Sequence, residues 1–380
     1  MATRPNSRRE LLKGAGLTAL GVGLSACAGR TGAPAAPAAR APGMRQRFAP
    51  VKVAEDRVIR SVVGLRPYRR AGVRVEAEKV GEKLVVHNYG HGGGGITLSW
   101  GTSELAVAEA WKTGERRFAV LGCGAVGLAT ARLLQQRGAE VTIYAKDLPP
   151  HTTSNIAGGQ WCPTSVMDAD RRTSASDRWL EQAARLSHRA YQQLPAGEFG
   201  IRWLPNYICS DEPLAEWWEQ ALTRDLYPDR AELRGDEHPF PFRYARRFTT
   251  MLIETPIYLP AMVREVRLAG GRIVVRELQD RQQIQGLPEP VVVNCTGLGA
   301  QTLFEDALME PVRGQLSFLL PQPEVDYIMI AGGLYMFPRR DGILLGGTFE
   351  HGASSLDVNE ETKARILAGH RRIFEGLREG

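Results

Sequence analysis

The stretch RFAVLGCGAVG, residues 117–127, decides the fold of this chain. It begins as a short apolar run typical of a buried strand. Three glycines at GxGxxG spacing follow, Gly122, Gly124 and Gly127, and then a helical pattern over residues 128–137. The first glycine permits a tight turn, the second lets a pyrophosphate approach the backbone, and the third lets the helix pack on the strand, with phosphates bound at the helix N-terminus. This order predicts a Rossmann-like dinucleotide-binding unit.

The next strand of this unit is expected at residues 140–145. About 20 residues after such a glycine loop, an acidic side chain meets the ribose hydroxyls of the dinucleotide. Lys146 and Asp147 stand at this point, so we assign the ribose to the Asp147 side chain or to the Lys146 backbone. Val126, just before the last glycine, is also expected among the cofactor contacts.

The chain has 380 residues, of which 43% are hydrophobic and 24% charged, enough for one large or two medium domains with a core. This composition excludes intrinsic disorder and a small disulfide-stapled fold. The formal net charge of +6 comes from the N-terminal part: residues 1–50 hold eight basic residues and one acidic residue, and residues 51–380 hold 40 basic and 41 acidic residues. The folded body therefore gives no electrostatic case for nucleic-acid binding.

The N-terminal segment has the features of an export signal. NSRRELLK, residues 6–13, is a twin-arginine pattern, and the weakly apolar residues 14–26 are too short to span a membrane as a stable helix. LSAC, residues 24–27, resembles the lipobox of bacterial lipoproteins, whose cysteine is acylated. We therefore expect the twin-arginine export machinery, a lipid anchor at Cys27 and a periplasmic, membrane-anchored protein. A cleaved soluble signal with a chance cysteine is the alternative.

Four cysteines follow Cys27, namely Cys123, Cys162, Cys209 and Cys295. They form no CxxC motif and no spacing with histidine that suggests a metal site, so we expect no metal. All four are expected to be buried or neutral thiols. A disulfide between Cys162 and Cys209 is chemically permitted in the periplasm, and the sequence leaves it open.

PVVVNCTG, residues 290–297, is a further β-branched strand that ends in a small polar turn. In flavoproteins with this Rossmann variant, such a late strand returns to the nucleotide domain, and its Thr-Gly pair lies against the cofactor. Together with the glycine loop, this pattern favours FAD over NAD. We therefore place Thr296 and Gly297 among the cofactor contacts, together with Leu278 upstream of the strand.

Six segments taken together resemble the D-amino-acid oxidase and D-aspartate oxidase family of FAD enzymes. The most specific is HNYGHGGGGIT, residues 87–97, and the resemblance covers nearly everything from about residue 55 to residue 380. The other five segments are GLRPYR (64–69), TTSNIAGGQW (152–161), NCTG (294–297), RGQ (313–315) and LGGTF (345–349).

The order of these segments departs from the family. There the GxGxxG strand opens the chain and the GLRP and HNYGHG segments close it, whereas here both precede it. No second copy of either motif occurs in the sequence, so we interpret the order as a circular permutation of a complete chain. Only residues 112–115 join the helix expected at 103–111 to the Rossmann strand, and residues near Gly380 are expected to lie near residues 55–62.

The resemblance implies an α/β fold, with a FAD-binding Rossmann-like domain and a second α+β substrate domain built on a mainly antiparallel sheet. Residues 51–115 are expected to contribute to both domains as the permuted segment. The other expected boundaries are an export signal at 1–27, a flexible tether at 28–50, the FAD-binding Rossmann core at 116–165, mainly substrate domain at 166–285, a return to the FAD domain at 286–300 and mainly substrate domain at 301–380.

The resemblance also implies a substrate clamp. Arg66 would bind the substrate carboxylate with its planar guanidinium, the Tyr335 hydroxyl would be the second member, and the Gly93 carbonyl would face the amine. Gln160 and Cys162 are expected to flank the pocket near the flavin. Cofactor contacts are expected from two segments, one with Gly92, Gly93, Gly94, Gly95, Ile96 and Thr97 and the other with Thr153, Ser154, Gly158, Gly159 and Gln160.

The activity that the resemblance implies is oxidative deamination of D-amino acids. The α-hydrogen passes as hydride to flavin N5, the imino acid hydrolyses to a 2-oxo acid and ammonia, and oxygen reoxidises the flavin to give hydrogen peroxide. No catalytic base is expected, and a membrane electron acceptor is an alternative to oxygen. Three other functions stay open: a glycine or N-methyl amino-acid oxidase, a D-aspartate oxidase, and a flavin-binding envelope lipoprotein without turnover.

Two departures from the family bear on the substrate. Its mammalian members carry a lid tyrosine just upstream of the clamp tyrosine, whereas residues 331–334 are AGGL here, so we expect a shorter or absent lid. D-Aspartate oxidases place an arginine after the Gly-Gly-Thr of the late strand, where this chain has Phe349. A substrate carboxylate there would be unpaired, which favours neutral or apolar D-amino acids. The cations that could replace that arginine are Arg69, Arg70, Arg339 and Arg340.

Overall fold

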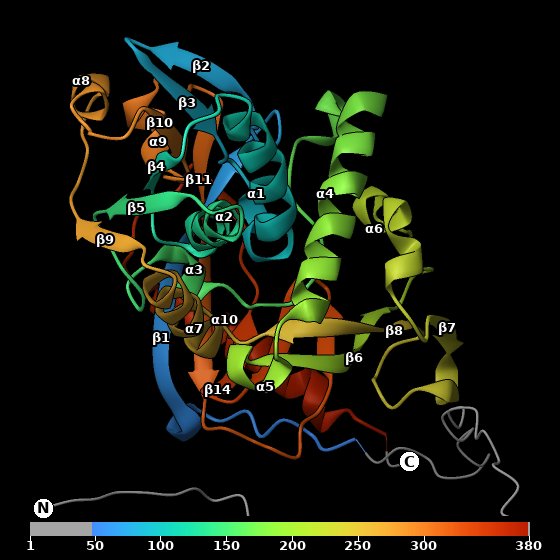
Figure 1. Cartoon of the computed structure of the whole chain (residues 1–380). Helices are drawn as coiled ribbons and strands as arrows, with labels where there is room; N and C mark the ends of the chain where they lie inside the picture. Colours follow the sequence, from blue (N-terminus) through green and yellow to red (C-terminus); the bar gives the residue numbers. More distant parts are fainter. Residues whose placement is uncertain (1–47, 379–380) are drawn as a thin grey trace, which may run out of the picture. The chain divides into compact units, whose positions relative to one another are not determined.

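The computed structural model describes residues 48–378. Two β-sheets carry these residues (Figure 1). The expected export signal, Cys27 and most of the expected tether lie outside the described residues, as do residues 379–380. Within the described part, no helix is long and apolar enough to cross a membrane.

A six-stranded sheet carries the glycine loop. Its order is β2-β3-β10-β4-β5-β9, and all neighbours are parallel except β2 and β3. Its inner strands are buried almost throughout, which explains their continuous apolar sequences. The strands are β2 (Ala77–Val80), β3 (Lys83–His87), β4 (Arg117–Leu121), β5 (Glu140–Ala145), β9 (Arg272–Val275) and β10 (Val291–Asn294).

Helices cover both faces of this sheet. Residues of α1, α2 and α7 share one apolar cluster with β4, β5 and β10, and these helices lie on the same side of the sheet in Figure 1. The short helices α8 and α9 contribute to the cluster on the opposite face. The bounds are α1 (Gly95–Trp111), α2 (Ala125–Gln136), α7 (Thr255–Leu268), α8 (Arg281–Gln285) and α9 (Gly299–Leu303).

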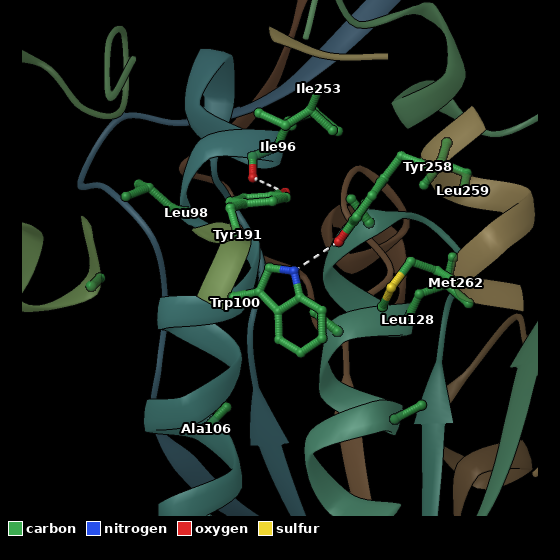
Figure 2. Packing of buried hydrophobic residues seen from close by; sticks show 14 of the residues in the cluster. Ile96, Leu98, Trp100, Ala106, Leu128, Tyr191, Ile253, Tyr258, Leu259 and Met262 are labelled. Atoms are coloured by element: carbon green, nitrogen blue, oxygen red, sulfur yellow. Dashed lines mark hydrogen bonds between the residues drawn. The ribbon is translucent and has the colours of Figure 1, made fainter. Parts of the chain in front are cut away.

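The core between these helices contains aromatic residues whose polar atoms are satisfied. Trp100 of α1 donates its indole N–H to the Tyr258 hydroxyl of α7 at 2.8 Å (Figure 2). Helix α4 (Ser174–Gln193) packs on α1, and its Tyr191 hydroxyl donates to the Ile96 carbonyl at 2.8 Å. Buried aromatic hydroxyl and indole groups need such partners, so these bonds determine how α1, α4 and α7 pack together.

A nine-stranded sheet forms the second layer. Its order is β1-β11-β14-β13-β12-β6-β8-β7, with β15 paired to β11, and only β12 and β6 are parallel. The strands are β1 (Val58–Arg69), β6 (Ile201–Ser210), β7 (Ala231–Arg234), β8 (Tyr244–Ile253), β11 (Met309–Leu319), β12 (Ile328–Ala331), β13 (Leu334–Arg339), β14 (Gly342–Gly346) and β15 (Glu350–His351). The remaining helices are α3 (Thr153–Ile156), α5 (Ala196–Phe199), α6 (Trp218–Leu222) and α10 (Glu360–Glu375).

One face of this sheet is covered by α10 and by the extended residues 48–54. Phe48 packs edge-on against Tyr327, with ring centroids 5.2 Å apart. In α10, the Arg371 Nε donates to the Val53 carbonyl at 3.1 Å. Helix α10, near the end of the chain, therefore lies beside the first described residues.

The structure confirms the α/β fold with a Rossmann-like domain and a largely antiparallel second sheet. Residues 51–115 contribute strands to both sheets, and β10 inserts between β3 and β4. The range 166–285, expected to be mainly substrate domain, also contains α7 and β9, which belong with the six-stranded sheet. Strand β9 supplies its edge beside β5, and α7 packs on α2.

The described cysteines are all free thiols, so this structure has no bond between Cys162 and Cys209. Burial raises the pKa of Cys162 to about 11, and that of Cys295 to about 12. Both thiols are therefore neutral near pH 7, as expected. No group of three or more His, Cys, Asp or Glu side chains in residues 48–378 could hold a metal ion.

Candidate active site

The glycine loop connects β4 to α2 as the sequence predicts. Gly122 has φ +103°, a conformation that L side chains rarely adopt, and a Cβ on it would lie 2.5 Å from the Cys295 carbonyl oxygen. A Cβ on Gly127 would lie 2.0 Å from the Gly122 carbonyl oxygen. The loop therefore closes only without side chains at these two positions, which places the N-terminus of α2 against the end of β10.

The start of α2 has the features of a phosphate site. Its N-cap residue, Gly124, makes no side-chain capping bond within the described chain. Ser154 of α3 reaches this end: its Oγ accepts from the Ala125 N–H at 3.0 Å. The other amides of the first turn, including that of Val126, point toward the place where an anion is favoured by the helix dipole. The expected Ser154 contact thus lies at the glycine loop.

The expected ribose end follows β5. Lys146 and Asp147 are both exposed, and the Lys146 Nζ lies 3.9 Å from Glu277 Oε1. Leu278 is partly buried beside the apolar cluster that contains Tyr144 of β5. The structure therefore gathers Lys146, Asp147 and Leu278 at one edge, where β5 and β9 end side by side.

The Thr296–Gly297 turn lies at the end of β10. The Thr296 hydroxyl donates to Asn294 Oδ1 at 2.7 Å, and the Thr296 backbone N–H donates to the same oxygen at 3.2 Å. A Cβ on Gly297 would lie 3.5 Å from the Cβ of Pro67 in β1. The turn is therefore next to both the glycine loop and the strand that carries Arg66.

The segment with six of the expected contacts, residues 92–97, forms a tight turn into α1. Gly93 is exposed, and a Cβ on it would lie 2.9 Å from the Thr164 carbonyl oxygen. Gly94 and Gly95 stand at the start of α1, followed by Ile96. Thr97 is buried, and its hydroxyl donates to the Cys162 carbonyl at 3.1 Å. This bond ties the turn to the loop after α3.

That second loop crosses the nine-stranded sheet. Gly158 packs directly on the Phe337 ring, and a Cβ added to Gly158 would lie 2.3 Å from a ring carbon. A Cβ added to Gly159 would lie 2.1 Å from the Ile253 carbonyl oxygen. Gln160 Nε2 donates to Asn206 Oδ1 at 2.8 Å. Thr153, at the start of α3, is exposed. The loop therefore joins the cofactor side to the sheet face that carries the clamp.

The clamp residues meet although they come from strands three apart in the sheet. Arg66 lies in β1 and Tyr335 in β13, and the Arg66 Nη2 donates to the Tyr335 hydroxyl at 3.2 Å. Two glycines on the strands between them make this possible. A Cβ on Gly314 would lie 2.5 Å from Arg66 Nη1, and one on Gly346 would lie 2.1 Å from the Tyr335 ring. Both side chains therefore lie flat on the sheet.

The guanidinium of Arg66 still has a hydrogen-bond donor available for a ligand. Its Nη1 is buried and has no hydrogen-bond partner among residues 48–378. Phe349 covers it, with the Arg66 Cζ 5.1 Å from the ring centroid, a cation–π contact. Burial raises the pKa of the Tyr335 hydroxyl, and the adjacent guanidinium opposes this only in part. The hydroxyl therefore remains a hydrogen-bond donor at neutral pH.

No lid lies above the clamp tyrosine in the hairpin between β12 and β13. Gly332 and Gly333 form a two-residue turn, both with positive φ, and Ala331 pairs directly with Leu334. The other candidate cations are already paired with acids, namely Arg69 with Asp306, Arg70 with Asp168, Arg339 with Asp341 and Arg340 with Glu254. None of these four cations is therefore left without an acidic partner among residues 48–378.

These residues fit a dinucleotide and a small acid side by side. The glycine turn and the N-terminus of α2, where the N-cap residue is a glycine without a capping side chain, suit a pyrophosphate. Residues 92–97 and 158–160 converge on the sheet face of the clamp. The residues that sequence reasoning did not assign are Gly314, Gly346 and Asn206. The first two lie in the RGQ and LGG segments, so the motifs signalled them without giving a role. Asn206 had no sequence signal.

The chain is similar in sequence to a family of flavin enzymes and to individual amino-acid oxidases. The pattern of the family described as FAD dependent oxidoreductase matches residues 117–380. A D-amino-acid oxidase of Rubrobacter xylanophilus is 31% identical over 256 residues, covering 66% of this chain and 75% of the relative. Human D-aspartate oxidase is 30% identical over 260 residues, covering 66% and 74%. The chain therefore belongs to the FAD dependent oxidoreductase family.

The solved structures agree on the fold. Glycine oxidase from Geobacillus kaustophilus matches with a TM-score of 0.53 at 18% identity, covering 70% of this chain and 81% of that one. Glycine oxidase from Bacillus cereus matches with a TM-score of 0.52 at 16% identity and the same coverage. The chain is thus an FAD-dependent oxidoreductase of the amino-acid oxidase kind, and its cofactor is FAD.

Replacing Gly127 by alanine should abolish flavin binding. The new methyl group would lie 2.0 Å from the Gly122 carbonyl oxygen, so the loop that receives the pyrophosphate must open. We expect the flavin content of the purified Gly127→Ala protein, measured as visible absorbance per protein, to fall by about tenfold or more. Gly197→Ala is the matched control, because nothing lies within 4 Å of the added Cβ. Equal flavin in both variants would contradict the assignment.

Proposed function

We propose that this enzyme oxidatively deaminates D-amino acids with neutral side chains to 2-oxo acids and ammonia, with hydrogen peroxide formed when oxygen is the acceptor. The observation that carries the proposal is the unpartnered, buried Nη1 of Arg66 beside the Tyr335 hydroxyl. The relatives named D-amino-acid oxidase and D-aspartate oxidase support it. Bound FAD supplies the chemistry of accepting a hydride at N5 from the substrate α-carbon.

The chain's own residues bind and orient the substrate. Arg66 offers a planar fork that pairs with both oxygens of a carboxylate, and Tyr335 donates a hydrogen bond to one of them. The raised pKa of Tyr335 keeps that donor protonated. Gly93 is exposed and has no side chain, so the substrate amine can approach it and donate a hydrogen bond to its backbone carbonyl. With both ends held, the α-hydrogen has one orientation, so positioning supplies most of the catalysis.

Neutral side chains are favoured by the surroundings of the clamp. Phe349 is 43% exposed and supplies no charge, and the four other arginines near the site are paired with acids. None of these four arginines is free to pair with a second substrate carboxylate, and burying that carboxylate unpaired is costly. D-Aspartate is therefore expected to be a poor substrate. The likeness to glycine oxidases concerns the fold alone.

The direct test is anaerobic mixing of the purified protein with D-alanine, D-methionine, D-aspartate, glycine and L-alanine. Bleaching of the flavin absorbance by D-alanine and D-methionine, but not by L-alanine, is the expected result. Fast bleaching by glycine instead would support a glycine oxidase, and no bleaching with any of them would support a flavin-binding protein without turnover. Admitting air afterwards separates an oxidase from an enzyme that uses a membrane electron acceptor.

Substituting the clamp arginine tests its role. Arg66→Lys keeps the charge but loses the planar fork, so we expect kcat/KM for D-alanine to fall about 100-fold, mostly through a higher KM. Arg189→Lys, an exposed arginine of α4, is the matched control and should change neither parameter. An unaltered KM in Arg66→Lys would exclude Arg66 as the carboxylate ligand.

We also propose that the chain is a circular permutation of the family's order. The family match begins at residue 117, while the GLRP and HNYGHG segments before it complete the two sheets: β1 pairs with β11, and β3 pairs with β10. The exposed residues 112–115 join α1 to β4. Residues 50–54 line a common hollow with Glu375, so the ends that a permutation would have joined lie close together.

Restoring the family's order should leave the enzyme active. The variant starts at residue 116, runs to residue 378, continues through a short Gly/Ser linker to residue 53 and ends at residue 114. We expect it to bind flavin and to oxidise D-alanine within a few-fold of the parent, since only surface connections change. The control has the same linker but its break between residues 106 and 107, inside α1, and should lose flavin. Loss of flavin in both would contradict the proposal.

The location of the protein is a separate proposal. The twin-arginine pattern and the LSAC sequence support export in folded form followed by lipid attachment at Cys27 in the bacterial envelope. Cys27→Ser should move the protein from the membrane fraction to the soluble periplasmic fraction, while Cys123→Ser should not. Equal membrane association of both variants would exclude an anchor at Cys27.

A further inference from the structure

Unpartnered polar groups gather where residues 160–162 cross the nine-stranded sheet. Asn206 of β6 is fully buried; its Oδ1 accepts from Gln160, but its Nδ2 has no partner among the described residues. Trp161 Nε1 and Gln220 Oε1 are likewise buried without a partner in residues 48–378. Gln220 Nε2 donates to Cys162 Sγ at 3.3 Å, so these groups belong to one neighbourhood. A buried polar group left without a hydrogen-bond partner destabilises the protein, so a ligand that supplies the partner is favoured.

This neighbourhood lies on the same sheet face as the clamp. Tyr335 pairs with Ile330, which pairs in turn with Ile208 of β6, two residues from Asn206. Residues two apart on a strand share a face, so Asn206 and Tyr335 point to the same side. Their strands are two spacings apart, about 10 Å, and Asn206 lies two residues, about 7 Å, further along β6 than the residue level with Tyr335. A substrate held at the clamp would therefore have to extend its side chain toward β6 to reach Asn206.

The loop after α3 connects the two places. The Tyr335 and Phe337 rings stack with centroids 5.3 Å apart, and Gly158 lies directly on Phe337. Two residues later, Gln160 reaches Asn206 and is only partly buried. The loop therefore runs from the neighbour of the clamp tyrosine, Phe337, to the hydrogen-bonded side chains of Gln160 and Asn206. We call these two side chains the amide wall, and its inner end is the unpaired amide group of Asn206.

The chemistry of the amide wall points to an amide ligand. A carboxamide presents one carbonyl acceptor and one NH₂ donor, so it satisfies the free half of Asn206 whichever way that amide is oriented. A hydrocarbon would leave the Asn206 group unpaired, and a carboxylate would bring a charge that the neutral amides of Gln160 and Asn206 cannot balance.

We propose that Gln160 and Asn206 form the side-chain end of the substrate pocket and select D-amino acids with a carboxamide side chain, D-asparagine or D-glutamine. This inference rests on the proposed D-amino-acid oxidase function and narrows its substrate class. Asn206 acts as a specificity-determining residue, and the hydrogen bond from Gln160 orients it.

The test compares substrates of equal shape on one enzyme. D-Asparagine and D-leucine differ by a carboxamide against an isosteric isopropyl group, and D-glutamine and D-methionine are similar in length. We expect kcat/KM to favour at least one carboxamide over its apolar counterpart by about tenfold or more. In Asn206→Leu the same ratio should fall to one or below, because the amide wall becomes apolar.

The ratio within one enzyme does not depend on how much protein is active. Gln160→Met, at a partly buried position, should lower the ratio as well and serves if Asn206→Leu does not fold. Gln322→Leu is the matched control: it removes an equally buried amide from the loop before β12, where its partners are Lys52 and Pro50, and should leave the ratio unchanged.

Each outcome decides the proposal. Ratios near one in the parent enzyme, with D-alanine still oxidised, would overturn the inference and leave the proposed function intact. A high ratio that survives Asn206→Leu would show that the unpaired amides bind only ordered water. If no D-amino acid reduced the flavin, the proposed function would fail and the inference with it.

Discussion

The active site depends on the register of β1 against β11. Gly64 pairs with Gly314 and Arg66 with Val312 in the part of the antiparallel ladder, from Arg60 to Arg69, that has no register shift. Because successive residues of a strand point to opposite faces, a slip of one residue would turn Arg66 away from the face that carries Tyr335. The same register places Gly64 against Ile156 of α3 and Pro67 beside Gly297, so the contact between the two sheets follows from it.

Space on the sheet is the second requirement. The strands between Arg66 and Tyr335 carry Gly314 and Gly346 at the points where the guanidinium and the phenol ring lie, and any side chain there would push the pair apart. The pair leaves one guanidinium nitrogen buried without a hydrogen-bond partner among residues 48–378, which costs stability in the free protein. A carboxylate bound there would recover that cost, so the arrangement would favour ligand binding over the stability of the ligand-free state.

Local signals predicted the nucleotide half well. The glycine loop, the parallel strands beside it and the late strand β10 are specified by short stretches whose geometry requires those residue types. Segments such as α7 and β9, which belong with the six-stranded sheet, look alike in either domain, because an amphipathic helix and a short apolar strand do not encode their partner. Asn206 escaped notice for the same reason, since its burial and its unpaired amide arise only when loop 157–162 crosses β6.

The sequence by itself determined the class of protein and the dinucleotide loop, and it predicted Arg66, Tyr335 and the HNYGHG segment as parts of the site. These features depend on residue type and local spacing, so they can be recognised without knowing the tertiary structure. The tertiary structure decided how Arg66 and Tyr335 meet across three strands, which glycines make room for them, and that Phe349 lies over the guanidinium. Those features depend on strand pairing between residues hundreds of positions apart, and no local pattern specifies such a register.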